Sequence, residues 1–283
     1  MPESALSGIR VIEVGGRGRD PGGAMSADEI VFEVQDGGIA WLTFNRPDAR
    51  NAMTFGMYRR LGEICRSPDP RMKVLVLRGA GDKAFVSGTD IAQFRGFKSP
   101  KDSLDYEAMM DSVFDALEDL PVPTIAAIQG ACTGGGAGIA AACDLRLGAP
   151  SAKFGFPIAR TLGNTLSLRN HSRLAALIGV ARTKDILFLA RLMDAQEMRA
   201  IGLLNEITTE HGLYARATEV ARTLLEHAPL TLRAAKEALN RVVRHWTPPG
   251  GGDDFVVRNY MSDDFREGIE AFLNKRKPRW TGK

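Results

Sequence analysis

The segment Gln129–Gly148 reads QGACTGGGAGIAAACDLRLG. The preceding residues, TIAAI, are typical of a buried strand, and the glycines Gly134, Gly135 and Gly136 stand between that strand and an alanine-rich helix. Glycine allows positive φ and lets a ligand approach the main chain closely, and N–H groups at the start of a helix attract anionic oxygen. The spacing differs from the GxGxxG of a dinucleotide loop and from the GK[ST] of a P-loop.

A second glycine turn, Ser87-Gly88-Thr89-Asp90, follows another apolar segment. Two backbone N–H groups aimed at one oxygen can stabilise an enolate or a tetrahedral oxyanion. Each turn taken alone could equally be a tight bend of the chain, so the surrounding segments have to decide between the two interpretations.

The rest of the chain alternates strand and helix patterns. The runs IVFEV and IAWLTF flank Asp36-Gly37-Gly38, which predicts a β-hairpin. Alternation of apolar strands with amphipathic helices is typical of an α/β fold with parallel pairing. Residues 79–96 are expected to form a glycine-rich loop, and residues 248–254 a turn-rich loop. The helical period dominates from about residue 172, with helices predicted at 172–178, 183–191, 195–201, 212–227, 230–243 and 263–275.

Six segments, in order along the chain, resemble the sequence blocks of the crotonase superfamily, the enoyl-CoA hydratase/isomerase family. They are FNRPDARNAM (Phe44–Met53), KAFVSGTDIAQF (Lys83–Phe94), the opening segment Gln129–Gly148, AKFGFP (Ala152–Pro157), ARLMDAQEMRAIGLLNEI (Ala190–Ile207) and EGIEAFLNKRKPRW (Glu267–Trp280).

The resemblance implies an α/β fold in which ββα repeats form a spiral, followed by a helical C-terminal region that mediates trimerisation, often within hexamers. It implies an acyl-CoA substrate, with coenzyme A as part of the substrate and no separate cofactor. The backbone N–H groups of Thr89 and Gly135 would form the oxyanion hole. The residues matching CoA-contacting positions are Ala49, Arg50, Asp90, Ile91, Phe272 and Lys275. For Lys275, a solvated helix face is an equally good interpretation.

Two family residues are absent. Hydratases of the family use two glutamates, and this chain has Gly138 and Ile158 at the matching positions. Glycine and isoleucine cannot transfer a proton, and losing a positioned acid or base commonly costs about 10²–10⁴-fold in rate. The usual two-glutamate hydration therefore cannot run unchanged.

Other side chains could replace the missing acid and base. Glu107 and Asp111 lie four residues apart on a predicted helix beside the acyl pocket, so they share a face. A solvated acidic face is the competing interpretation for this pair. Tyr106 is expected to pack in the core, Asp144 to make structural hydrogen bonds, and His171 to be structural or exposed. Residues 94–120 and 158–170 are expected to line the acyl pocket.

Composition limits the function classes. The chain has 283 residues and a net charge of +3, without the basic stripe of a nucleic-acid-binding protein. Its three cysteines form no CxxC pair, which favours reduced thiols and no metal site. No run is long enough to span a membrane, and the first residues lack the apolar stretch of a secretory signal. We expect a cytoplasmic protein with an N-terminal extension (1–25, with one short strand at Leu6–Val14), an α/β core (26–210) and a helical region (211–283).

The reaction stays open between several alternatives. The first is enoyl-CoA hydratase or isomerase chemistry through a thioester enolate. The second is decarboxylation or isomerisation of an acyl-CoA, and the third is a non-catalytic CoA-thioester-binding oligomer. A serine hydrolase is a weaker alternative, because the sequence has no G-x-S-x-G motif.

Overall fold

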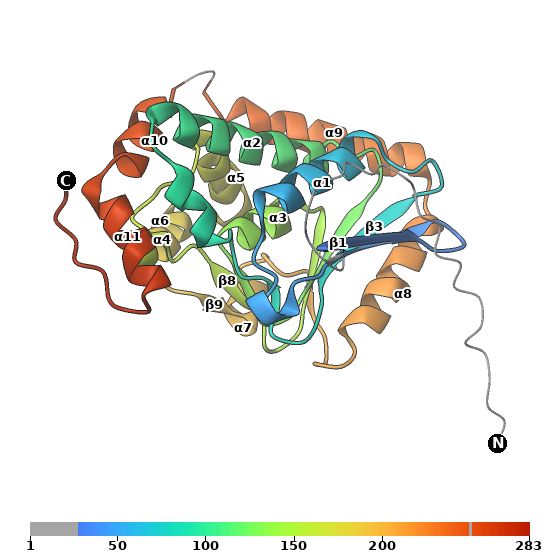
Figure 1. Cartoon of the computed structure of the whole chain (residues 1–283). Helices are drawn as coiled ribbons and strands as arrows, with labels where there is room; N and C mark the ends of the chain where they lie inside the picture. Colours follow the sequence, from blue (N-terminus) through green and yellow to red (C-terminus); the bar gives the residue numbers. More distant parts are fainter. Residues whose placement is uncertain (1–27, 249–250) are drawn as a thin grey trace, which may run out of the picture.

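The computed structural model describes residues 28–248 and 251–283. The predicted N-terminal extension and the short strand Leu6–Val14 lie outside these ranges. The described chain forms two sheets, with helices on both faces of the larger one (Figure 1).

The larger sheet has six strands in the order β1-β2-β3-β5-β7-β10, and the smaller has four in the order β4-β6-β8-β9. The strands of the larger sheet are β1 (Ile30–Val34), β2 (Ile39–Phe44), β3 (Val74–Gly79), β5 (Thr124–Ile128), β7 (Leu145–Gly148) and β10 (Glu206–Ile207). Those of the smaller sheet are β4 (Ala84–Val86), β6 (Ala131–Thr133), β8 (Lys153–Gly155) and β9 (Met193–Asp194). The pair β1–β2 is antiparallel, which confirms the predicted hairpin, while β2, β3, β5, β7 and β10 pair in parallel.

The chain winds as a spiral because successive strands alternate between the two sheets. The pairs β3–β4, β5–β6 and β7–β8 each place one strand in the larger sheet and the next in the smaller. Helix α2 (Pro100–Glu118) follows the pair β3–β4 after a short 3₁₀ segment, and α3 (Gly135–Ala142) follows β5–β6 directly. The short helix α4 (Ile158–Thr161) follows the pair β7–β8. This arrangement confirms the expected spiral of ββα repeats.

Both faces of the larger sheet are buried, which explains why its strands are apolar at nearly every position. Alternate side chains of a strand point to opposite faces. Trp41, Val76 and Ile125 pack toward α8 (Leu213–Leu225), whereas Leu42 and Leu77 belong to the main core. The main core also includes apolar side chains of α1 (Phe55–Arg66), α2 and α3.

The C-terminal half is helical, as expected, but its elements differ in detail. The helices not yet named are α5 (Leu168–Ile178), α6 (Val180–Phe188), α7 (Ala195–Ala200), α9 (Pro229–His245), α10 (Asp253–Tyr260) and α11 (Asp263–Leu273). No helix was predicted at α10, where the sequence was interpreted as a turn-rich loop running to residue 254 followed by an unassigned stretch. The predicted loop 79–96 likewise contains the strand β4 and the 3₁₀ helix η2 (Ile91–Gly96).

Candidate active site

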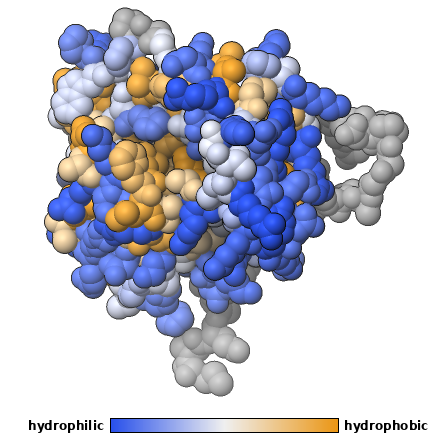
Figure 2. Space-filling view, turned by 90° about the vertical axis from the view of Figure 1, so that its left-hand side faces the viewer, coloured by the Kyte–Doolittle hydropathy of each residue, from blue (hydrophilic) through white to orange (hydrophobic). Residues whose placement is uncertain are grey.

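Three loops leave the carboxyl ends of strands in the smaller sheet and lie close together. Strands β4, β6 and β8 pair in parallel, so their carboxyl ends lie side by side. The segments that leave these ends are Gly88-Thr89, Gly134-Gly135 and Pro157-Ile158. Together with α2, α10 and α11 they enclose a cavity of about 880 Å³. Figure 2 shows the face that carries α10 and α11, where apolar side chains gather around a hollow.

The two glycine turns leave backbone donors free at this cavity. Gly88 (φ 114°) and Gly134 (φ 54°) have positive φ, which glycine adopts without strain. The residues that follow them, Thr89 and Gly135, both line the cavity, and neither backbone N–H has an acceptor among the described residues. Gly135 is the first residue of α3, where a free N–H is expected. The arrangement suits the binding of an oxygen that carries negative charge.

A chain of hydroxyl groups lies beside these donors. The Thr89 hydroxyl is 2.9 Å from the Tyr58 hydroxyl and 2.9 Å from that of Tyr106. A Cβ atom on Gly135 would lie 1.8 Å from the Tyr58 oxygen, so this position accepts only glycine. Burial raises the pKa of both tyrosines, so both keep their protons. Tyr106 therefore packs in the core as predicted, but its hydroxyl also has a polar role at the cavity wall.

Gly138 and Ile158, at the two positions where the family resemblance implies glutamates, both line the cavity. A Cβ atom on Gly138 would lie 2.6 Å from the ring of Phe114 on α2. The space that a side chain at position 138 would need is therefore occupied by the Phe114 ring. The packing around position 138 therefore fits a glycine and leaves no room for a carboxylate side chain.

Glu107 is a buried carboxyl in the wall of this cavity, with its residue only 6 % exposed. The Tyr260 hydroxyl donates to its Oε1 at 2.6 Å, and the Ser167 backbone N–H donates to its Oε2 at 2.8 Å. Burial raises its pKa to about 7, with the nearby charge of Asp111 acting in the same direction and both hydrogen bonds opposing it. The interpretation of Glu107 as part of a solvated acidic face is wrong, because α2 turns this side chain inward.

Asp111 lies one turn further along α2 and does not line the cavity. Its Oδ1 accepts hydrogen bonds from the Ser167 hydroxyl at 2.7 Å and from the Asn170 amide at 3.1 Å. These bonds hold the start of α5 against α2. Asp111 is therefore half-buried and lies outside the cavity, where its hydrogen bonds join two helices.

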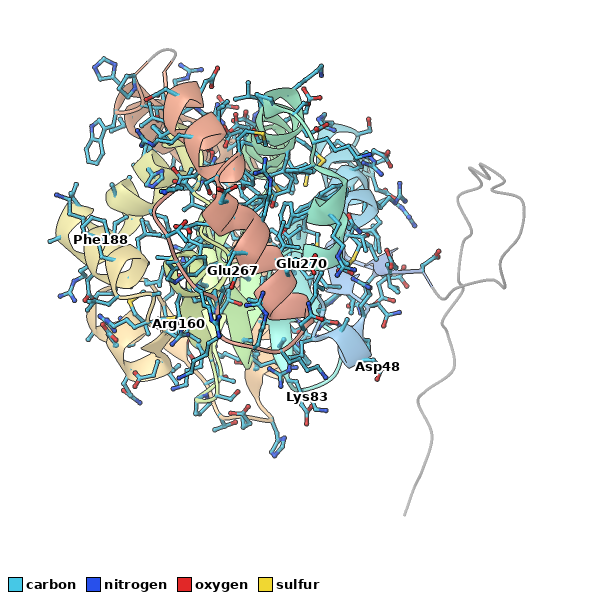
Figure 3. The ribbon with its side chains drawn as sticks, turned by 60° about the vertical axis from the view of Figure 1, so that its left-hand side comes forward. Asp48, Lys83, Arg160, Phe188, Glu267 and Glu270 are labelled. Atoms are coloured by element: carbon cyan, nitrogen blue, oxygen red, sulfur yellow. The ribbon has the colours of Figure 1, made fainter. Side chains whose placement is uncertain are left out.

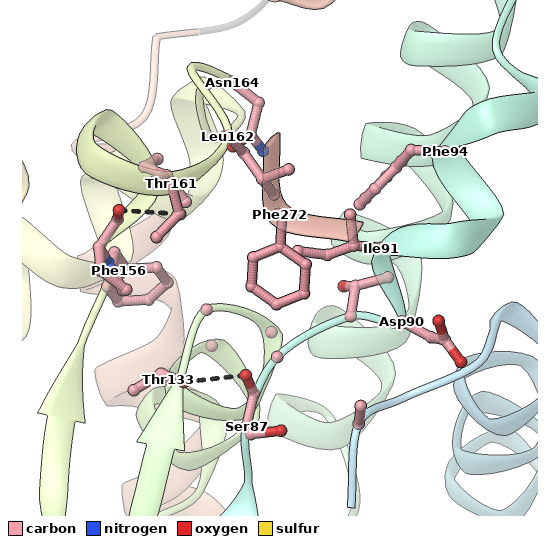
Figure 4. Close-up of a pocket in the computed structure, with 18 of the residues that line it drawn as sticks. Ser87, Asp90, Ile91, Phe94, Thr133, Phe156, Thr161, Leu162, Asn164 and Phe272 are labelled. Atoms are coloured by element: carbon pink, nitrogen blue, oxygen red, sulfur yellow. Dashed lines mark hydrogen bonds between the residues drawn. The ribbon is translucent and has the colours of Figure 1, made fainter. Parts of the chain in front are cut away.

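All six residues that match CoA-contacting positions border the same cavity: Ala49, Arg50, Asp90, Ile91, Phe272 and Lys275. They come from segments far apart in the sequence, and Figure 4 shows Phe272 of α11 facing Ile91 and Asp90 across the pocket. The Asp90 carboxylate is bound by Arg46 at 3.0 Å. Phe272 is 51 % exposed, which is high for a phenylalanine without a ligand.

The sequence pattern does not point to Tyr260, because it predicts no helix at α10. A helix-start signal is present, since Asp253 and Asp254 follow Gly252 and acidic residues favour a first turn. Two other expectations are confirmed. Asp144 accepts structural hydrogen bonds from Thr124, and the Nδ1 of His171 lies 2.9 Å from the backbone oxygen of Ser167.

Residues 94–120 and 158–170 were expected to line the pocket. They supply Phe94, Tyr106, Glu107, Met110, Phe114, Ile158, Thr161, Leu162, Asn164, Leu166 and Asn170. Within residues 28–248 and 251–283, no group of three or more histidine, cysteine or carboxylate side chains is arranged to hold a metal ion. None of the helices in these ranges is long and apolar enough to cross a membrane.

Known proteins are similar to this chain in sequence and in fold. A structure titled enoyl-CoA hydratase/carnithine racemase from Magnetospirillum magneticum is similar with a TM-score of 0.73 and 35% identity, covering 91% of this chain and 97% of that one. A methylmalonyl-CoA decarboxylase in complex with 2-nitronate-propionyl-CoA has a TM-score of 0.81 and 25% identity, covering 91% and 100%. The short-chain-enoyl-CoA hydratase of Clostridium acetobutylicum is 31% identical over 259 residues, which is 89% of this chain and 97% of the relative.

The fold and the cavity thus define a protein of the crotonase superfamily. The family model described as enoyl-CoA hydratase/isomerase matches residues 34–283. The chain belongs to the enoyl-CoA hydratase/isomerase family.

Proposed function

We propose that this protein isomerises an enoyl-CoA thioester, with Glu107 as its single acid–base group. The observation that carries the proposal is the position of Glu107. Three carboxylates border the cavity among the described residues: Asp48 is exposed, Asp90 is bound by Arg46, and Glu107 alone is buried. A carboxyl whose pKa is about 7 can both accept and return a proton at neutral pH.

The proposed reaction moves one proton within the substrate. The ionised Glu107 carboxylate removes a proton from C2 of a 3-enoyl thioester, and the electron pair of the broken C–H bond forms a dienolate. The N–H groups of Thr89 and Gly135 stabilise the negative charge on the thioester oxygen. Glu107 then returns the proton to C4, which gives the 2-enoyl thioester and restores the carboxylate.

Isomerisation fits these residues better than hydration does. The family's hydration uses two carboxylates, and this cavity has neither of the two at positions 138 and 158. A 1,3-shift needs one group to remove and return a proton. The same group must be ionised at the start, so activity should fall as the pH drops below about 7.

The test is conversion of 3-enoyl-CoA to 2-enoyl-CoA, followed by the absorbance of the conjugated thioester. Glu107→Gln is expected to lower kcat by about 10²–10⁴-fold while thioester binding persists. Asp105→Asn is the matched control, because Asp105 lies on the exposed face of α2 and pairs with Lys101. Full activity of Glu107→Gln, or its loss in Asp111→Asn alone, would show that the assignment is wrong.

Decarboxylation is the second candidate. The similar methylmalonyl-CoA decarboxylase superposes with a TM-score of 0.81, above the 0.73 of the hydratase/racemase structure. Loss of CO₂ leaves a thioester enolate directly, so it needs the oxyanion donors more than a base. Release of CO₂ from a malonyl-type thioester, undiminished in Glu107→Gln, would favour this reaction over isomerisation.

A further inference from the structure

One tyrosine hydroxyl lies between the two residues whose backbone N–H groups are free at the cavity. The Tyr58 oxygen is 2.9 Å from the Thr89 hydroxyl, and a Cβ atom on Gly135 would lie 1.8 Å from that same oxygen. The Thr89 hydroxyl oxygen lies 3.4 Å from this Cβ position. Tyr58 is fully buried and does not line the cavity. Any effect of its hydroxyl on a ligand must therefore pass through Thr89 and Gly135.

The peptide groups that carry the two N–H donors are each fixed at their carbonyl end. The Gly88 oxygen, which shares a peptide group with the Thr89 N–H, accepts a hydrogen bond from the Met53 N–H at 2.8 Å. The Gly134 oxygen, which shares a peptide group with the Gly135 N–H, accepts a backbone N–H of α3 at 3.0 Å. These bonds set the direction of each donor, but neither bond links one donor to the other.

The spacing between the donors matters because both have to reach one oxygen. An oxyanion donor acts at about 2.7–3.1 Å from the charged oxygen, and a displacement of about 1 Å can cost about 10²-fold in rate. Each donor follows a glycine, Gly88 or Gly134, whose backbone can rotate at little cost. The Tyr58 hydroxyl contacts both donor residues, so it can keep their separation constant.

The rings that carry these hydroxyls are held firmly in the core. Tyr58 on α1 is 0 % exposed. Tyr106 on α2, whose hydroxyl is 2.9 Å from that of Thr89, packs against Phe55 and Phe94 with ring centroids 5.5 Å and 5.0 Å away. Closely packed rings cannot follow a displaced neighbour. The Thr89 side chain is therefore bonded to two groups whose positions are set by the core.

We propose that the Tyr58 and Tyr106 hydroxyls are positioning groups, which hold Thr89 and Gly135 at the separation that lets two N–H donors meet one thioester oxygen. In this role neither hydroxyl transfers a proton or contacts a reacting atom. The inference rests on the proposed function in requiring that Thr89 and Gly135 form the oxyanion hole. It does not depend on whether isomerisation or decarboxylation follows.

The test is infrared difference spectroscopy of bound butanoyl-CoA with an isotope label at its thioester carbonyl carbon. This saturated ligand undergoes neither proposed reaction. Two N–H donors polarise the C=O bond, so its stretching frequency should fall on binding to the wild-type protein. Tyr58→Phe should lose about half of this shift, because one of the two donors no longer meets the oxygen. Calorimetry on the same samples should show that butanoyl-CoA still binds, which also establishes that the variant is folded.

The other variants test the role of the hydroxyl chain. Thr89→Val keeps the shape of the side chain but breaks both hydrogen bonds, so it should lose at least as much of the shift as Tyr58→Phe. Thr89→Ser keeps a hydroxyl and should retain more of the shift than Thr89→Val. Tyr214→Phe is the matched control and should leave the shift unchanged. The Tyr214 hydroxyl donates to the Gly79 oxygen at 3.1 Å beside α8 and does not line the cavity.

An unchanged shift in Tyr58→Phe would overturn the inference and leave the proposed function intact. A loss confined to Tyr106→Phe would also overturn it, because Tyr106 borders the cavity and could contact the ligand directly. If butanoyl-CoA binds to the wild-type protein without any shift, the oxyanion hole itself is contradicted, and both proposals fail together.

Discussion

The burial of Glu107 has a measurable effect on stability. Its pKa is about 7 in the folded chain against 4.5 for an ordinary glutamate. Below pH 4.5 the group is protonated in both states, and its neutral form suits the buried position. Between about pH 4.5 and 7 only the unfolded state ionises, so folding stability is lost as pH rises and stays lower above pH 7.

The corresponding prediction concerns Glu107→Gln, which cannot ionise. Relative to wild type, the free energy of unfolding of the variant should rise by about 2–3 kcal/mol between pH 5 and pH 8, because this range covers most of the shift in pKa from 4.5 to about 7. Thermal unfolding at the two pH values measures this change. The amide also meets the Ser167 N–H less well than a carboxylate does, but that cost does not depend on pH. If the stability difference between Glu107→Gln and wild type is the same at pH 5 and at pH 8, the pKa of Glu107 lies in its ordinary range.

At the scale of elements, the packing of α2 against α3 determines which side chains position 138 can hold. Gly138→Glu would push its Cβ toward the Phe114 ring, which is 2 % exposed and has little room to move. We expect a loss of about 1–3 kcal/mol, as is usual for overpacking. The cost of Gly138→Glu should shrink when it is made in a Phe114→Ala background, which a double-mutant cycle by chemical denaturation would show. Additive effects of the two changes would mean that Phe114 is not the obstacle.

Helix α10 supplies the hydroxyl that supports the ionised form of Glu107. Removing this hydrogen bond in Tyr260→Phe should raise the pKa of Glu107 further, because the bond opposes the effect of burial. The acid limb of kcat/KM for 3-enoyl-CoA isomerisation should then move to higher pH. If the acid limb of the pH profile does not move, Tyr260 has no influence on the proton transfer by Glu107.

The sequence predicts the elements of the core better than it predicts the site. Strands such as IAWLTF and TIAAI are recognisable because both of their faces are buried, and glycine turns are recognisable by composition. The inward orientation of Glu107 is different, because it depends on how α2 sits against α5 and α10. The same spacing of Glu107 and Asp111 fits a solvated face or a buried one. Helix α10 was missed because a glycine-rich stretch directly precedes its eight residues.

At the scale of the whole molecule, one helix has an apolar side that residues 28–248 and 251–283 leave exposed. No residue of α9 is buried, yet Leu239 and Val242 are 65 % and 56 % exposed and share a face with Trp246. Phe188 at the end of α6 is also exposed, and Figure 3 shows it at the edge of the molecule. Large apolar surfaces of this kind often mark contacts with another molecule.

We propose that copies of this chain cover the α9 surface in a trimer or hexamer, as the family resemblance implies. Light scattering of the purified protein should give three or six times the mass of one chain. The double substitution Leu239→Asp and Val242→Asp should give a smaller species, because it places carboxylates in the apolar contact, whereas Arg241→Asp on the polar side of α9 should not. Arg241 is a suitable control because its side chain is 82 % exposed and forms only a long contact of 4.0 Å with Glu237. A monomeric wild-type protein would contradict the assembly and would leave the apolar side of α9 to a different partner.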